Sequence, residues 1–124
     1  MRNYISLVII VVVVVILFAF NIYVTNSIEY DLLNCAVNLH IKVSENLNCT
    51  NEYNEFVTKL KKSEVKMNMI FNHSAYNDIM ECVIDIGNDI EFDDKKLLNA
   101  NVDKLIFYLK DLIGNEKAEI NNIL

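Results

Sequence analysis

Three cysteines have the most evident chemistry in this sequence, and all three follow its apolar N-terminal stretch. They are Cys35, Cys49 and Cys82. If this part of the chain is exported, it enters an oxidising compartment in which a disulfide is favourable. One disulfide and one odd thiol is then the simplest outcome, and three pairings are open. A Cys35–Cys49 bond would close a short loop, whereas a Cys49–Cys82 bond would constrain the unfolded chain more.

The remaining reactive residues give little support for metal binding or nucleophilic catalysis. His40 and His73 are isolated, and the sequence has no C-x-x-C or H-x₃₋₅-H spacing of the kind that binds zinc. We interpret Cys35 and His40 as a core thiol beside a surface imidazole, because no orienting group for a catalytic pair lies nearby. The acidic run from Asp85 to Asp94 lacks the spacing of a calcium loop. We therefore expect no enzymatic activity, no cofactor and no metal site.

Two N-x-[S/T] sequences are candidate N-glycosylation sites, with Asn48 and Asn72 as the acceptors. Matches of this length also arise by chance in a chain rich in Asn, Ser and Thr. Their use would place this part of the chain in a secretory or extracellular compartment.

Residues 5–24 form an uncharged and almost wholly apolar segment. As a helix, twenty residues span about 30 Å, the thickness of a bilayer hydrocarbon core. We expect residues 1–26 to be a retained signal-anchor that contacts the lipid bilayer through residues 5–24. A cleaved signal peptide is the alternative, although its apolar region is usually shorter. Arg2 before the segment and Glu29 after it predict a cytoplasmic N-terminus and an extracytoplasmic C-terminus.

The remainder of the chain is acidic. The whole sequence carries a net charge of −6, and its single arginine, Arg2, precedes every acid. Ten lysines against seventeen acids leave the part after the anchor at −7. Such a surface repels phosphate backbones and anionic lipid, so we expect no nucleic-acid partner.

The pattern after the anchor predicts an extracytoplasmic α+β domain over residues 27–114. Val37–Val43 and Val65–Phe71 alternate apolar with polar residues, which is the period of a strand. A hairpin is expected around Gly87, because β-branched residues flank a Gly-Asn-Asp turn. These segments give a sheet of three or four strands with helices packed against it.

Helices are expected over Asn51–Lys62 and from Asp93 to Gly114, because each has one apolar face. Residues 115–124 are mostly polar and predict a loose C-terminal tail. An all-α small bundle is the alternative, although Gly87 would interrupt one of its helices at a cost of about 1 kcal/mol. Its apolar stripes would be Ile28, Leu32, Ala36, Leu39 and Val43 in one helix and Ile79, Val83, Ile86 and Ile90 in another.

An anchor over Ile5–Val24, a small body, and a strand-turn-strand-helix order over Val83–Leu98 form a distinctive layout. This layout resembles the small N-terminally anchored subunits of the poxvirus entry–fusion complex. The resemblance implies a non-enzymatic subunit that helps to hold a multi-protein assembly on the virion membrane. It is a likeness of order and spacing, so no functional residue is carried over, and three cysteines depart from the even numbers usual in that family.

The sequence therefore predicts a non-enzymatic, single-pass membrane protein. Its extracytoplasmic domain would bind other membrane or envelope proteins, as a subunit of a viral envelope assembly. The alternative is a small secreted ligand or immune modulator that is released by signal-peptide cleavage, and a helical bundle would favour that class.

Overall fold

The structure is a computed structural model that describes residues 2–71 and 73–123. Within these residues every regular element is helical, and no strand is present. The predicted α+β fold is therefore wrong, and the alternative, an all-helical bundle, is the observed architecture. The elements are α1 (Arg2–Ile28), the π-helical segment η1 (Glu29–Leu33), α2 (Asn34–Ser44), α3 (Thr50–Lys62), α4 (Glu64–Ile70), α5 (His73–Glu91) and α6 (Lys95–Ile123).

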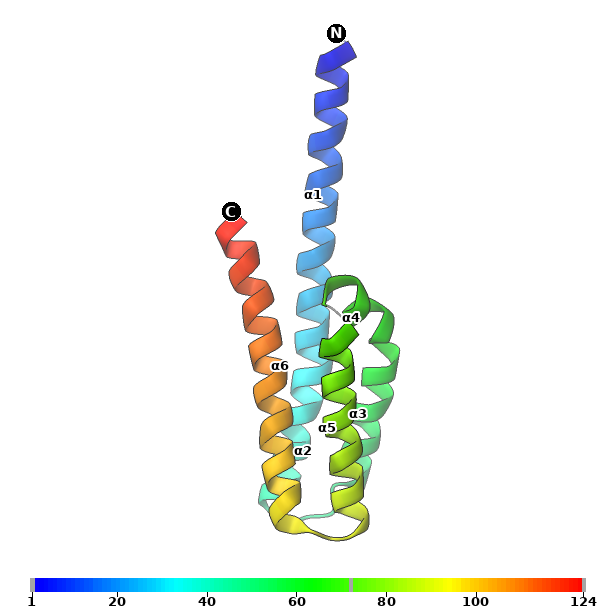
Figure 1. Ribbon diagram of the computed structural model, residues 1–124, viewed down its shortest axis with the longest axis vertical. Helices are drawn as coiled ribbons and strands as arrows, with labels where there is room; N and C mark the ends of the chain where they lie inside the picture. Colours follow the sequence, from blue (N-terminus) through cyan, green and yellow to red (C-terminus); the bar gives the residue numbers. More distant parts are fainter. Residues whose placement is uncertain (1, 72, 124) are drawn as a thin grey trace.

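The first three elements form one continuous helix. It runs over Asn3–Ser44, a length of 42 residues, or about 60 Å. Its first part stands clear of the rest of the protein (Figure 1). The large apolar side chains from Tyr4 to Leu17 are 47–72% exposed, whereas Val24 is only 1% exposed. The same helix therefore passes directly from an exposed apolar segment into the core of the body.

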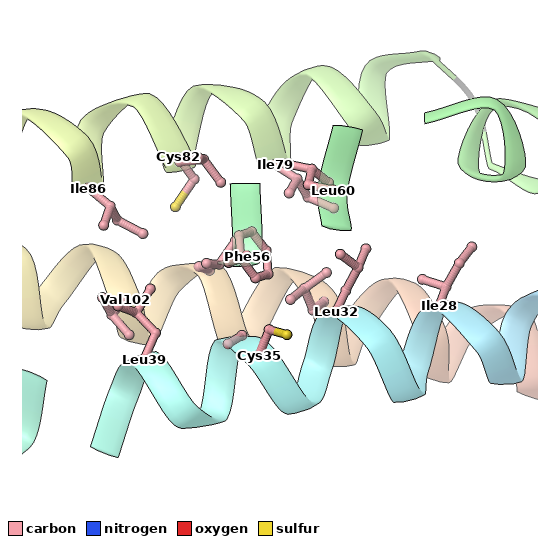
Figure 2. Close-up of a cluster of buried hydrophobic side chains, with 14 of the residues drawn as sticks. Ile28, Leu32, Cys35, Leu39, Phe56, Leu60, Ile79, Cys82, Ile86 and Val102 are labelled. Atoms are coloured by element: carbon pink, nitrogen blue, oxygen red, sulfur yellow. The ribbon is translucent and has the colours of Figure 1, made fainter. Parts of the chain in front are cut away.

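The body is a bundle in which the long helix packs against α3 and α6, and α5 packs against the same two helices (Figure 1). The short helix α4 lies at the end of the bundle where α1 leaves it, in contact with α1, α3 and α5. Figure 2 shows Phe56 of α3 in the middle of the core, among Leu32 of the long helix, Cys82 of α5 and Val102 of α6. Burial of these apolar side chains between the helices is the main force that holds the bundle together.

The strand predicted at Val37–Val43 is part of α2 instead. Leu39 and Val43 are buried, while Val37 and Ile41 are on the exposed side. Residues four apart share a helix face, so alternation over seven residues also describes two such pairs on opposite faces. The helical stripe of the alternative is confirmed, because it is buried at every position, namely Ile28, Leu32, Ala36, Leu39 and Val43.

The second predicted strand, Val65–Phe71, is also wrong. Residues up to Ile70 form α4, and Phe71 follows in an extended conformation. Met67 is fully buried, whereas Val65 and Met69, on the opposite face, are 70% and 64% exposed. The alternation thus arises from a short helix with apolar residues on both its inner and its outer face.

The predicted hairpin around Gly87 is absent, because α5 continues through this position. The glycine is explained by close packing and not by a turn. A Cβ atom at Gly87 would lie 2.5 Å from the hydroxyl oxygen of Tyr53, on α3. That hydroxyl donates a hydrogen bond to the carbonyl oxygen of Val83, at 3.1 Å. Tyr53 therefore fixes α3 against α5 in the space that a side chain would otherwise fill.

The two predicted helices are present, with one difference at the C-terminus. The helix predicted over Asn51–Lys62 is α3. The last helix, α6, follows Asp94, whose carboxylate oxygen Oδ1 accepts a hydrogen bond from the backbone N–H of Leu97 at 3.2 Å, which is the role of a helix cap. It does not end at Gly114 but continues to Ile123. The segment expected to be a loose tail is thus helical as far as it is described.

Candidate functional site

A pocket of about 310 Å³ lies at the end of the bundle opposite the exposed part of α1. We call this end the distal end. Two connections form the pocket, one between α2 and α3 and the other between α5 and α6. Both polar and apolar residues line it. The lining residues are Val43, Asn46, Leu47, Asn48, Cys49, Thr50, Ile90, Asp93, Lys95, Leu98 and Asn99.

The two connections begin with the same backbone motif. Asn46 and Asp93 have φ angles of 56° and 52°, and short polar residues tolerate this left-handed conformation better than most. After α2, the N–H of Leu47 donates to the Lys42 carbonyl and that of Asn46 to the Val43 carbonyl. This pair of bonds defines the Schellman motif.

The end of α5 repeats this pattern. The N–H of Asp94 donates to the Asp89 carbonyl at 3.0 Å, and that of Asp93 to the Ile90 carbonyl at 3.3 Å. Both helices therefore end in tight, hydrogen-bonded turns, which fix the walls of the pocket.

Large apolar side chains are exposed beside the pocket. Phe92 is 78% exposed, Leu97 is 51% exposed and Leu47 is 49% exposed. Sequence reasoning did not single out these residues. The sequence did contain a signal for these exposed residues. In Asn46-Leu47 and in Phe92-Asp93, an apolar residue lies next to one that tolerates the left-handed turn conformation.

The chemistry of the pocket is that of a binding surface. Its ionisable side chains include Asp93 and Lys95, and its thiol is that of Cys49. Burial raises the pKa of the Cys49 thiol above its usual value, so the sulfur stays protonated and weakly nucleophilic at neutral pH. The amide oxygen of Asn48 accepts a hydrogen bond from the Thr50 N–H at 3.0 Å. This bond orders the entry to α3.

All three cysteines are buried in the core, and the other two lie further from the distal end. Cys35 Sγ lies 3.8 Å from Glu55 Oε1 of α3, and Cys82 Sγ lies 3.4 Å from the backbone carbonyl oxygen of Asn101 on α6. Both are buried. Burial raises the pKa of both thiols, and that of Cys82 to about 11. Each sulfur is therefore a neutral, inward-facing group with its own polar contact.

The structure gives all three cysteines as free thiols and does not bring any two of them together as a disulfide. Cys49 lies in the distal pocket with Val43 and Ile90. Cys35 lies eight residues before Val43 on the long helix, and Cys82 lies eight residues before Ile90 on α5. Each of these separations is about 12 Å along the helix. Figure 2 shows the Phe56 ring between Cys35 and Cys82. A disulfide needs Cα atoms within about 7 Å of each other.

The remaining candidate residues are dispersed. His40 Nδ1 lies 3.3 Å from Asp103 Oδ1 and links α2 to α6 at the surface. Among the described residues, no group of three His, Cys, Asp or Glu side chains is arranged to hold a metal ion. Asn48 is exposed at the rim of the pocket. The second candidate glycosylation site, Asn72, lies outside the described residues.

The fold and this site define a class of protein: a small helical bundle with an N-terminal helix that is long and apolar enough to cross a membrane. The same length and composition also occur in signal sequences. No family model, curated protein or solved structure matches the chain.

Proposed function

We propose that this chain is a non-enzymatic, single-pass membrane protein whose helical body binds another protein through its distal end. The observation that carries this proposal is the pocket of about 310 Å³ with Phe92 and Leu47 exposed beside it. Exposed aromatic and aliphatic side chains around a concave site are typical of protein-binding surfaces. An anchor in the membrane would confine the body near partners in the same membrane and raise their effective concentration.

The size and chemistry of the pocket favour binding over catalysis. Its volume is at the lower end of the range for small-molecule sites, about 300–1,000 Å³, which suits one or two protruding side chains of a partner. A catalytic site would need a nucleophile or an acid–base pair with a suitable pKa. The pocket's thiol, Cys49, has a pKa raised by burial, which is the opposite of activation.

Retention of the N-terminal helix is favoured by the way α1 enters the core. Val24, Thr25 and Ile28 are each only 1% exposed, so they belong to the packed interior of the body. The nearest candidate cleavage sequence, Thr25-Asn-Ser27, lies within this same stretch of helix. Cleavage there would remove core residues and leave their apolar partners exposed, at a cost in stability.

A secreted ligand remains the second candidate, because the helical body is the architecture that such ligands use. The burial of Val24 and Thr25 opposes it for the reason just given. Membership of a viral envelope assembly, which the layout of the sequence implied, also remains a proposal. Part of that layout, the strand-turn-strand order in Val83–Leu98, is replaced by the end of α5, a turn and the start of α6.

The test is to purify the full-length protein from membranes in mild detergent and to identify proteins that accompany it in stoichiometric amounts. After enzymatic removal of N-glycans, intact mass should show the full chain of 14.3 kDa in the membrane fraction. We expect a Leu47→Asp/Phe92→Asp variant to lose the partner. An Ile84→Asp variant should retain it, because Ile84 is a similarly exposed residue on α5 away from the pocket lining.

Two outcomes would contradict the proposal. One is the absence of a partner at every detergent strength. The other is a soluble product shortened at its N-terminus, which would support the secreted ligand.

A further inference from the structure

The end of the body nearest the exposed part of α1 includes a lysine-rich segment that the net charge of the chain conceals. Residues 58–71 contain four lysines and one acid, Glu64, and so carry a net charge of +3. The rest of the chain after the anchor is then at −10. Lys59 pairs with Glu55 on its own helix, at 3.8 Å. The other three lysines, Lys61, Lys62 and Lys66, lie where α3 ends and α4 begins.

Apolar side chains are exposed among these lysines. Val65 and Met69 are 70% and 64% exposed. They are four residues apart and so share one face of α4, and Lys62, the last residue of α3, lies just before α4 begins. Met67, on the opposite face, is fully buried against the core. This face of α4 therefore points away from the bundle. We call Lys61, Lys62, Val65, Lys66 and Met69 the α4 patch.

The position of the α4 patch identifies what it faces. α4 contacts α1 and lies at the end of the body where the apolar part of α1 begins (Figure 1). The part of α1 beyond this point is the segment that is apolar enough to cross a bilayer. When that segment is inserted, the surface of the same bilayer lies next to the α4 patch.

We propose that the α4 patch contacts the surface of the membrane in which α1 is anchored. Val65 and Met69 enter the boundary between headgroups and acyl chains, as the apolar face of an interfacial helix does. Lys61 and Lys62 extend their apolar stems along this boundary and place their ammonium groups at lipid phosphates. The contact holds the bundle upright on the membrane and directs the distal pocket away from it. This inference depends on the membrane anchoring proposed above.

The contact has a consequence for the end of α6. Figure 1 shows the last turns of α6 extending past the level of α4, towards the same end of the molecule as the exposed part of α1. Asn122, near the end of α6, is exposed, and polar residues do not enter hydrocarbon readily. Gly114 precedes these turns and has nothing within 4 Å of the position of a Cβ atom. We therefore expect the helix to bend at Gly114 and to follow the membrane surface.

The chain contains no tryptophan, so a single introduced tryptophan reports its own surroundings. Met69→Trp places the reporter in the α4 patch, and Phe92→Trp is the matched control at the distal end. Val13→Trp reports on the anchor itself. Each full-length variant is reconstituted into phosphatidylcholine vesicles whose acyl chains carry bromine, a quencher, with and without phosphatidylglycerol. Circular dichroism confirms that the variants remain folded.

We expect strong quenching of Val13→Trp. Met69→Trp should lose most of its fluorescence, and its emission maximum should shift to shorter wavelength. Phe92→Trp should remain unquenched. Phosphatidylglycerol should increase the quenching of Met69→Trp, and Lys61→Glu/Lys62→Glu in the same variant should abolish that increase.

If Val13→Trp is quenched but Met69→Trp is quenched as weakly as Phe92→Trp, the membrane contact is overturned. The anchor would still be in place. An unquenched Val13→Trp would overturn the anchoring and the contact together. Quenching of Met69→Trp that is the same in both lipids and in the lysine variant would overturn the role of the lysines.

Discussion

Gly87 and Gly114 are both helical glycines, and their surroundings give them different roles. At Gly87 the Tyr53 hydroxyl occupies the space of a Cβ atom, whereas Gly114 has open space. Helix propensity alone favours alanine over glycine by about 1 kcal/mol at either position. At Gly87 this gain is outweighed, because a methyl group would displace Tyr53 and break its hydrogen bond to Val83.

We therefore predict opposite effects of the same substitution. Gly87→Ala should lower the free energy of unfolding by about 1–3 kcal/mol, the usual cost of overpacking. Gly114→Ala should leave it unchanged or raise it by up to about 1 kcal/mol. Denaturant unfolding of the two variants in the same detergent, followed by circular dichroism, measures both. Equal stabilisation by the two substitutions would show that Tyr53 does not occupy the space next to Gly87.

The three thiols give a second prediction at this scale. Maleimide labelling in denaturant without reductant should add three labels per chain, because the structure has three free thiols. A single label would instead show the disulfide that the sequence suggested. Without denaturant, all three cysteines should react much more slowly than in the unfolded chain, because each is buried and protonated.

The pKa of Cys82 also links stability to pH. Burial raises it from 9.0 to about 11 in the folded state, so the fold favours the neutral thiol. Its contribution is complete below about pH 9 and is lost as the pH rises through 11. We expect Cys82→Ala to be less stable than the parent at pH 8, and the difference to shrink towards pH 11. Parallel denaturant titrations at the two pH values measure this change, and a constant difference would contradict it.

At the scale of the elements, the long N-terminal helix has two functions along its length. Its first part is exposed and apolar, and its last part supplies core residues such as Ile28 and Leu32. A segment that only tethered the body would not need this burial. If the first part crosses a membrane, the helix can transmit its orientation to the bundle, because the two parts belong to one continuous helix.

Neighbouring positions on this helix provide a matched test. Ile28 is 1% exposed, and Tyr30, two residues further, is 71% exposed. We expect Ile28→Ala to destabilise the body by about 2–5 kcal/mol, through lost burial and the cavity left behind. Tyr30→Ala should change the free energy of unfolding by about 0.5 kcal/mol or less. Denaturant titration of the full chain in detergent compares them, and similar effects would contradict the proposed role of α1 in the core.

The helices also show which parts of the fold the sequence could indicate. Patterns longer than three turns correctly predicted three features. These are the apolar segment, the helix over Asn51–Lys62 and the start of the last helix. Val37–Val43 and Val65–Phe71 are only seven residues long, too short to separate a strand from two i,i+4 pairs on opposite helix faces. The role of Gly87 depends on Tyr53, thirty-four residues away, so no local pattern could reveal it. The distal site also escaped prediction, because it requires two distant turns to meet.

For the whole molecule, the two ends of the body differ in chemistry. The α4 patch is positive and lies next to the apolar part of α1. The distal end has the pocket and exposed Phe92 and Leu47. In a membrane-anchored chain this polarity would place lipid contacts at one end and partner contacts at the other. Net charge, which averages over both ends, gave no indication of this separation.

The side of the membrane on which the distal end lies can be determined through Asn48. This residue is exposed at the pocket rim, and its hydrogen bond to Thr50 uses the amide oxygen. A glycan attaches to the amide nitrogen, so glycosylation is compatible with the observed conformation. If the body is extracytoplasmic, translation with microsomes should give a glycosylated product. The enzyme that removes N-glycans should restore its original mass.

The expected controls follow from the same geometry. Asn48→Gln should remove this glycan, and so should Thr50→Ala. The second substitution leaves Asn48 in place, together with its hydrogen bond, because the donor is the backbone N–H of residue 50. Loss of glycan in both variants would therefore reflect the acceptor sequence and not a disturbed loop. As the opposite control, an acceptor sequence is added before Arg2. If this added site is glycosylated and Asn48 is not, the N-terminus is lumenal and the body lies in the cytoplasm. In that case the distal pocket would face cytoplasmic partners.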